Sequence, residues 1–229
     1  MLQKHTGSCK LRFQPLEPRH MMAGDVHAYF PTPGDLAFIG GTAGNDSLVL
    51  SANGKGYTLK GRDGTTIDGA SQISFKTVSN NLTIDMGAGN DTLVVTDLVV
   101  AKNLYISMGA GKDAILIQDV KTGADLVVDG DDAATGPGGS DVVALNRVQV
   151  GNNCVVNTGD SKDLAILNKV KAKNILNANT GYGDNDLLLV LACSAASAEL
   201  YDGDTGGTLL SAKNNFGSQV VAGFDRVRS

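Results

Sequence analysis

An acidic residue follows a glycine-containing corner at a nearly constant interval along most of this 229-residue chain. The intervals are 22, 28, 22 and 23 residues in the series Asp91, Asp113, Asp141, Asp163 and Asp186. The long interval contains an insertion, DDAATGPGGS, at residues 131–140. A period of this size is typical of a solenoid, because each repeat is one unit that can bury its apolar face only against its neighbours.

The same period extends beyond this series at both ends. Asp46 lies 45 residues before Asp91, an interval that fits two more periods, and Thr208 stands at the corresponding place after Asp186. Residues 36–229 therefore predict about seven repeats. The first and last repeats differ from the others, as terminal capping repeats do.

Apolar residues alternate with polar ones inside each repeat. The repeat that begins at Asp141, for example, places apolar side chains at Val143, Leu145, Val148, Cys154 and Val156. Alternation with a period of two predicts strands rather than helices. Three short strands per repeat predict an all-β fold, a right-handed parallel β-helix of about seven coils stacked ~4.8 Å apart. The 29 glycines and the absence of tryptophan suit such a narrow core with many corners.

The cysteines have different expected positions in this fold. Cys154 and Cys193 fall at inward positions on different walls, so we expect both to be buried and not to form a disulfide with each other. Cys9 lies far away, in the N-terminal segment.

Residues 1–35 differ in composition from the rest of the chain. All three histidines and four of the five prolines lie here, and the absence of a regular period predicts a mostly disordered tail. Its basic start lacks the apolar stretch of an ordinary secretory signal. Within it, LRFQPLEPRHMMAGD (residues 11–25) resembles the LEPR-XLL segment of exported, often repeat-bearing proteins of planctomycetes and some other bacteria. Residues 16–19 match its core, whereas Met21 and Met22 replace two leucines. The resemblance implies export or sorting to the cell surface.

The corner motif MGAGNDTLVV, at residues 86–95, resembles the nonapeptide repeat of the RTX proteins. That resemblance implies calcium bound by aspartates and turn carbonyls. The RTX motif recurs about every nine residues, however, whereas this chain repeats it once per 22. We expect the aspartates to be structural corner residues that accept hydrogen bonds from turn amides, with Lys112 and Lys162 offsetting their charge. A calcium-binding column is the alternative.

The insertion is the better candidate for a metal site. Its carboxylates are Asp129, Asp131 and Asp132, and the next coil brings Asp160 to the neighbouring corner. Calcium prefers six to eight oxygen ligands on flexible loops, which these residues could help to supply. Two interpretations stay open: a calcium site formed by these four residues, and a solvated acidic loop without a cofactor.

Composition also bears on partners and function. The net charge of −5, without a long basic run, argues against nucleic acid, and no apolar stretch is long enough for a transmembrane helix. Residues 36–229 contain no histidine, and no repeat departs from its neighbours in a way that would form a catalytic cleft. The sequence predicts an exported or cell-surface β-helix without enzymatic activity, with a structural or adhesive role toward an extracellular polymer. The alternative is a calcium-dependent carbohydrate-binding or carbohydrate-cleaving β-helix protein.

Overall fold

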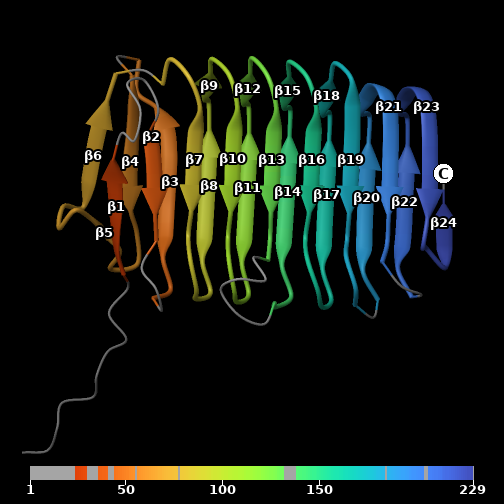
Figure 1. Cartoon of the computed structure of the whole chain (residues 1–229), viewed down its shortest axis with the longest axis horizontal. Helices are drawn as coiled ribbons and strands as arrows, with labels where there is room; N and C mark the ends of the chain where they lie inside the picture. The colour runs from red at the N-terminus through yellow and green to blue at the C-terminus, as the bar shows by residue number, and fades with distance from the viewer. Residues whose placement is uncertain are drawn as a thin grey trace, which may run out of the picture.

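The computed structural model describes residues 24–29, 36–40, 44–54, 56–76, 78–131, 138–183, 185–203 and 206–228. All of its regular elements are strands, and they stack as parallel coils into a β-solenoid of about six turns (Figure 1). The prediction of an all-β parallel solenoid is therefore confirmed.

Each central coil contains three strands, as the alternation of apolar residues predicts. The first wall is formed by β8 (Thr92–Thr96), β11 (Ala114–Gln118), β14 (Val142–Asn146), β17 (Leu164–Asn168), β20 (Leu187–Leu191), β22 (Thr208–Ala212) and β24 (Arg226–Arg228). Short strands follow at β9 (Val99–Val100), β12 (Lys121–Thr122), β15 (Gln149–Val150) and β18 (Lys171–Ala172). The third set is β10 (Leu104–Ser107), β13 (Leu126–Asp129), β16 (Cys154–Asn157), β19 (Ile175–Asn179), β21 (Ser194–Tyr201) and β23 (Asn215–Ala222).

The coils are held in register by parallel pairing. Leu93, Ile115 and Val143 are paired across successive coils of the first wall, and the insertion at residues 131–140 leaves this register unchanged. The strands on either side of the long interval therefore keep the same inward and outward faces.

The N-terminal end has a different topology. Its strands are β1 (Asp25–Tyr29), β2 (Leu36–Ile39), β3 (Ser47–Ala52), β4 (Tyr57–Gly61), β5 (Thr66–Ile67), β6 (Gln72–Phe75) and β7 (Leu82–Asp85). Strand β3 pairs directly with β8, whereas β4 and β6 form antiparallel pairs beyond it. The 45 residues between Asp46 and Asp91 are thus one coil with an antiparallel excursion, so the prediction of about seven coils is too high. The excursion begins at Asn53-Gly54, a dipeptide that favours a hairpin turn.

Regular structure begins before the predicted boundary at residue 36. Strand β1 pairs antiparallel with β2 and parallel with β5, and Val26 is fully buried. Residues 25–29 of the segment assigned to the tail therefore belong to the end of the solenoid. The LEPR-XLL-like residues 11–23 lie outside the described residues.

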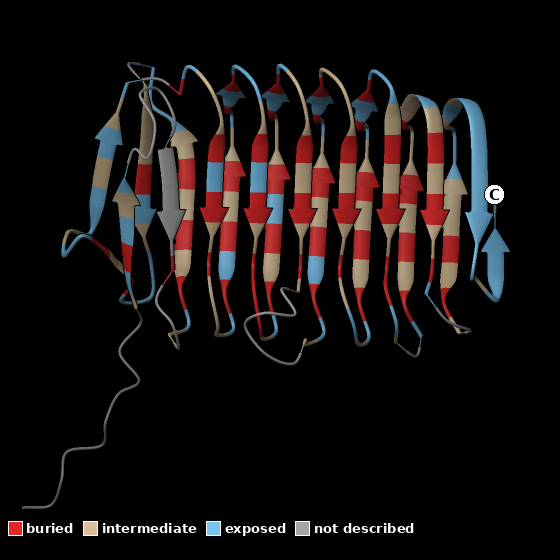
Figure 2. Cartoon of the chain, in the orientation of Figure 1, coloured by how far each residue is buried: buried red, intermediate tan, exposed pale blue. Residues whose placement is uncertain are grey.

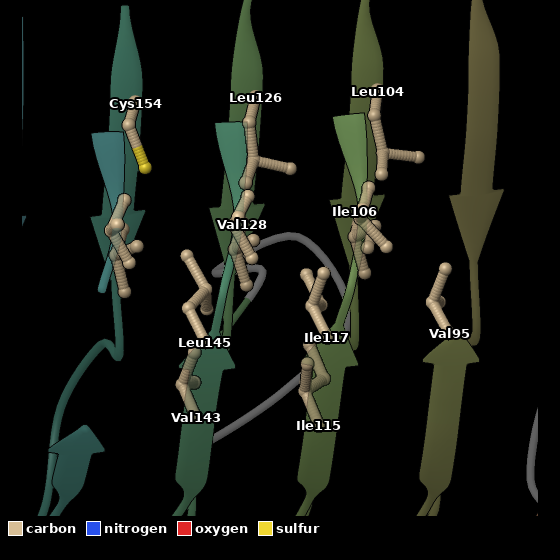
Figure 3. Packing of buried hydrophobic residues seen from close by; sticks show 14 of the residues in the cluster. Val95, Leu104, Ile106, Ile115, Ile117, Leu126, Val128, Val143, Leu145 and Cys154 are labelled. Carbon is tan, nitrogen blue, oxygen red and sulfur yellow. The ribbon is translucent and has the colours of Figure 1, made fainter. Parts of the chain in front are cut away.

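The core is a set of continuous apolar stacks between the walls. Figure 3 shows Ile115, Ile117, Val143 and Leu145 pointing from the first wall toward side chains of the third set of strands. These inward positions are 0–3 % exposed. Cys154 and Cys193 are buried in this core with free thiols, as predicted.

The C-terminal coil continues this core without covering it. Val221 pairs with the buried Leu200 and is 37 % exposed, and Val227 pairs with the buried Leu209 and is 56 % exposed. Strands β23 and β24 are accordingly mostly exposed and are drawn in pale blue in Figure 2. Each of these residues has a coil on one side only, which explains its exposure.

Candidate functional site

The repeated acidic residues form a buried row that we call the aspartate column. They are 1–3 % exposed, and the column consists of Asp46, Asp91, Asp113, Asp141, Asp163 and Asp186. From Asp46 to Asp163, the backbone N–H of each aspartate donates to Oδ1 of the aspartate in the next coil, at 2.6–2.8 Å. The prediction that these carboxylates accept turn amides is confirmed. Their near-complete burial was not predicted.

Glycine allows the corners to stack closely enough for this contact. A Cβ at Gly111 would lie 1.5 Å from the carbonyl oxygen of Gly89 in the preceding coil, and Gly111 has a φ of +142°. Any side chain there would force the two coils apart. The Gly-x-Gly-x-Asp pattern is therefore explained by backbone approach and amide capping together.

Burial changes the acidity of the column. It raises the pKa of Asp91 to about 7, of Asp113 to about 6 and of Asp141 to about 8, although the N–H donated to each carboxylate acts in the opposite direction. Burial also raises the pKa of Asp163 to about 7. Neighbouring aspartates add to the shift, because like charges disfavour ionisation. Near neutral pH, protons relieve part of the repulsion within the column.

The two lysines beside the column do not offset its charge by ion pairing. Lys112 and Lys162 are exposed, and the ion pairs among the described residues are His27–Asp68 and Arg147–Asp119. The expectation that Lys112 and Lys162 offset the column's charge thus finds no ion pair to support it.

The structure brings only part of the predicted metal site together. Asp129, at the end of β13, accepts a hydrogen bond from Nδ2 of Asn157 at 3.0 Å. Asp131 accepts the backbone N–H of Asp160 at 2.9 Å and that of Gly139 at 3.3 Å. Asp160 thus meets Asp131 through its backbone N–H, while burial and the charges of Asp160 and Asp129 raise the pKa of Asp131. Asp132 lies outside the described residues.

Asp131 is electrostatically linked to the aspartate column. Burial raises its pKa, and its charge in turn raises the pKa of Asp113, Asp141 and Asp163. A calcium site would need more oxygen ligands at one place than Asp131 and its contacts supply, since calcium takes six to eight. Within the described part of the chain, no three acidic, histidine or cysteine side chains are grouped so that they could hold a metal ion. The oxygens Oδ2 of Asp91, Asp113 and Asp141 are buried without a hydrogen-bond partner, but each belongs to a different coil.

A second feature lies at the short strands, away from the aspartates. We call it the basic groove, and its cationic side chains are Lys121, Arg147, Lys169, Lys171 and Lys173. Sequence analysis missed it because Lys169, Lys171 and Lys173 alternate within five residues, whereas Lys121 and Arg147 lie in two other repeats and join them only when the coils stack. The available signal was the repeat itself, since Arg147 and Lys169 are one period of 22 residues apart.

The described residues include no helix long and apolar enough to cross a membrane. Comparison of the chain with protein-family models, with curated proteins and with solved structures gives no match. Any functional assignment therefore depends on the residues of the chain itself.

Proposed function

We propose that this chain is an exported module of the bacterial cell surface with a structural or adhesive role and without enzymatic activity. The proposal combines the LEPR-XLL-like segment, which indicates export, with a solenoid whose exposed walls repeat every coil. Such a surface presents side chains at equivalent positions of the coil every ~4.8 Å, which suits contact with an extended polymer.

The observation that carries the proposal is the inward position of the acids with raised pKa. Asp91, Asp113 and Asp141 are at most 3 % exposed and each accepts a backbone N–H. Glycoside cleavage uses a pair of carboxyl groups that face the substrate across an open site. Carboxyl groups enclosed in the corner of a solenoid cannot reach a polymer outside it, so they support the fold rather than catalysis.

Deletion of residues 1–23, which ends before β1, tests the export step. The full chain should be accessible to an antibody on intact cells, whereas the truncated chain should remain folded inside them. Cell fractionation and circular dichroism of the purified truncated chain measure the two properties. Equal surface delivery of both chains, or retention of the full chain inside the cell, would remove the basis for a surface role.

The alternative is a calcium-dependent carbohydrate-binding or carbohydrate-cleaving protein. What favours it is Asp131, which accepts the backbone N–H of Asp160 and whose charge raises the pKa of Asp113, Asp141 and Asp163. The two functions differ in their response to calcium, which the intact chain can report directly.

A further inference from the structure

We infer that the basic groove binds a linear acidic polysaccharide, in which carboxylate or sulfate groups recur along the sugar chain. The inference rests on the proposed adhesive role and gives the polymer a chemical class.

The groove is built from the same turn and the same short strand in successive coils. Strands β12, β15 and β18 lie side by side along the upper edge in Figure 1, with Lys121, Gln149 and Lys171 in register. The preceding turn places Asp119, Arg147 and Lys169 in a parallel row, each with φ of 55–56°. Cationic side chains are thus arranged in two rows along the solenoid axis.

An open depression runs between these side chains. Its main part has a volume of about 540 Å³ and is lined by the two rows, and a continuation of about 250 Å³ extends past Gly151 to Lys173. At Gly151 the coils approach closely, because a Cβ there would lie 2.1 Å from the carbonyl oxygen of Gly123. The open depression gives an extended polymer room to lie across the coils.

The charge of the groove is opposite to that of the protein. Five cationic side chains and one carboxylate, Asp119, line the groove, and Asp97 is next to Asp119 in the same row, although the whole chain carries −5. Arg147 already holds Asp119 through two hydrogen bonds of 2.6 Å. The four lysines form no ion pair with any described residue. They are therefore available to an external anion.

The spacing favours a polymer over a small anion. Neighbouring coils are ~4.8 Å apart, so Arg147 and Lys169 are about one such step apart and Lys121 and Lys171 about two. A single exposed ion pair contributes little, but a chain with repeated charges engages several at once. Gln149 lies between the two lysines and offers an amide to sugar hydroxyls.

Nucleic acid fits this surface less well. Proteins that hold single strands usually stack the bases on aromatic side chains. The described residues that line the groove include no aromatic side chain. Charge without a stacking surface suits an acidic polysaccharide better.

Calorimetric titration of the purified full chain tests the inference. Polygalacturonate and dextran sulfate serve as probes, and neutral dextran and DNA serve as comparisons. The salt concentration should be about 50 mM, because higher concentrations screen exposed charges strongly. The groove variant combines Lys169→Gln with Lys171→Gln. The matched control combines Lys112→Gln with Lys162→Gln, which removes the same charge beside the aspartate column.

The wild type and the control should bind the acidic polysaccharides with dissociation constants within about twofold of each other. The dissociation constant of the groove variant should be at least about tenfold higher. A second variant, Lys121→Gln with Lys173→Gln, should show the same loss and leaves the left-handed turn at Lys169 unchanged. No binding by the wild type, equal loss in groove and control variants, or tighter binding of DNA would overturn the inference. Binding by purified protein is independent of export, so this test and the surface-delivery test can fail separately.

Discussion

The aspartate column is explained by a backbone donor at each solenoid corner. The N–H of each corner residue faces the interior and needs an acceptor, since an unpaired buried N–H is costly. Aspartate in the next coil supplies Oδ1. At the C-terminal end, Gly207 aligns with Asp186, and Asp202 accepts its N–H through Oδ2 at 2.9 Å. Where the column ends, the carboxylate of Asp202 thus accepts the backbone N–H of the corner residue.

Stability should fall as pH rises from about 5 to about 8. Folded-state pKa values of about 7 for Asp91 and about 8 for Asp141 lie above the unfolded value of roughly 3.9. The folded state therefore binds more protons in this window, and the free energy of unfolding decreases as they dissociate. Urea denaturation at pH 5 and pH 8 measures the difference.

His27 acts in the same direction and requires its own control. Hydrogen bonding to Asp68, at 2.9 Å, raises the pKa of His27, so the stability it contributes is also lost as pH rises. The comparison should be made in a His27→Gln background. Stability that is constant or greater at pH 8 in that background would show that the column is not protonated.

Replacement of Asp141 separates its hydrogen bond from its charge. Asp141→Asn keeps an acceptor for the N–H of Asp113 and should leave stability at pH 5 nearly unchanged while reducing the pH dependence. Asp141→Ala removes the acceptor and should lower the free energy of unfolding by about 1–3 kcal/mol. Urea denaturation measures both losses of unfolding free energy. Equal losses in the two variants would show that the 2.8 Å hydrogen bond to Asp141 does not stabilise the fold.

At the scale of the strand, the sequence predicted most of the coil because inward and outward residues alternate without interruption. Leu145 is fully buried and Val142, on the same strand, is 40 % exposed. Counting intervals between corner residues failed at the two ends. Asp46 to Asp91 spans twice the usual interval but contains antiparallel pairs, and the last interval is 21 residues, so that Thr208 aligns with Leu187 and not with Asp186. Interval counting cannot distinguish a coil from a hairpin of equal length.

A charge on the inward face should unfold the chain, whereas the same charge on the outward face of the same strand should not. Leu145→Asp buries an unpaired carboxylate in β14 and should cost about 4 kcal/mol or more. Val142→Asp should cost about 1 kcal/mol or less, mainly through strand propensity. Circular dichroism and thermal melting compare the two variants. An unchanged melting temperature for Leu145→Asp would contradict the assignment of the core.

At the scale of the whole molecule, stacking creates features that no single repeat contains. Cationic side chains from three successive coils become the basic groove, and carboxylates on separate coils become a buried column with raised pKa values. The sequence predicted where these residues lie on the coil. It could not show the burial of the carboxylates or the raised pKa values that follow, because both depend on the neighbouring coils.

The most direct test of a metal-independent scaffold is the melting temperature of the intact chain with millimolar calcium and with a chelator. The two temperatures should agree within about 1 °C, since protons and backbone amides suffice for the corners. A melting temperature that rises with calcium concentration would contradict this account. Loss of that rise in Asp131→Asn would place calcium at the insertion. Loss in Asp91→Asn would place it in the aspartate column and support the RTX-like arrangement.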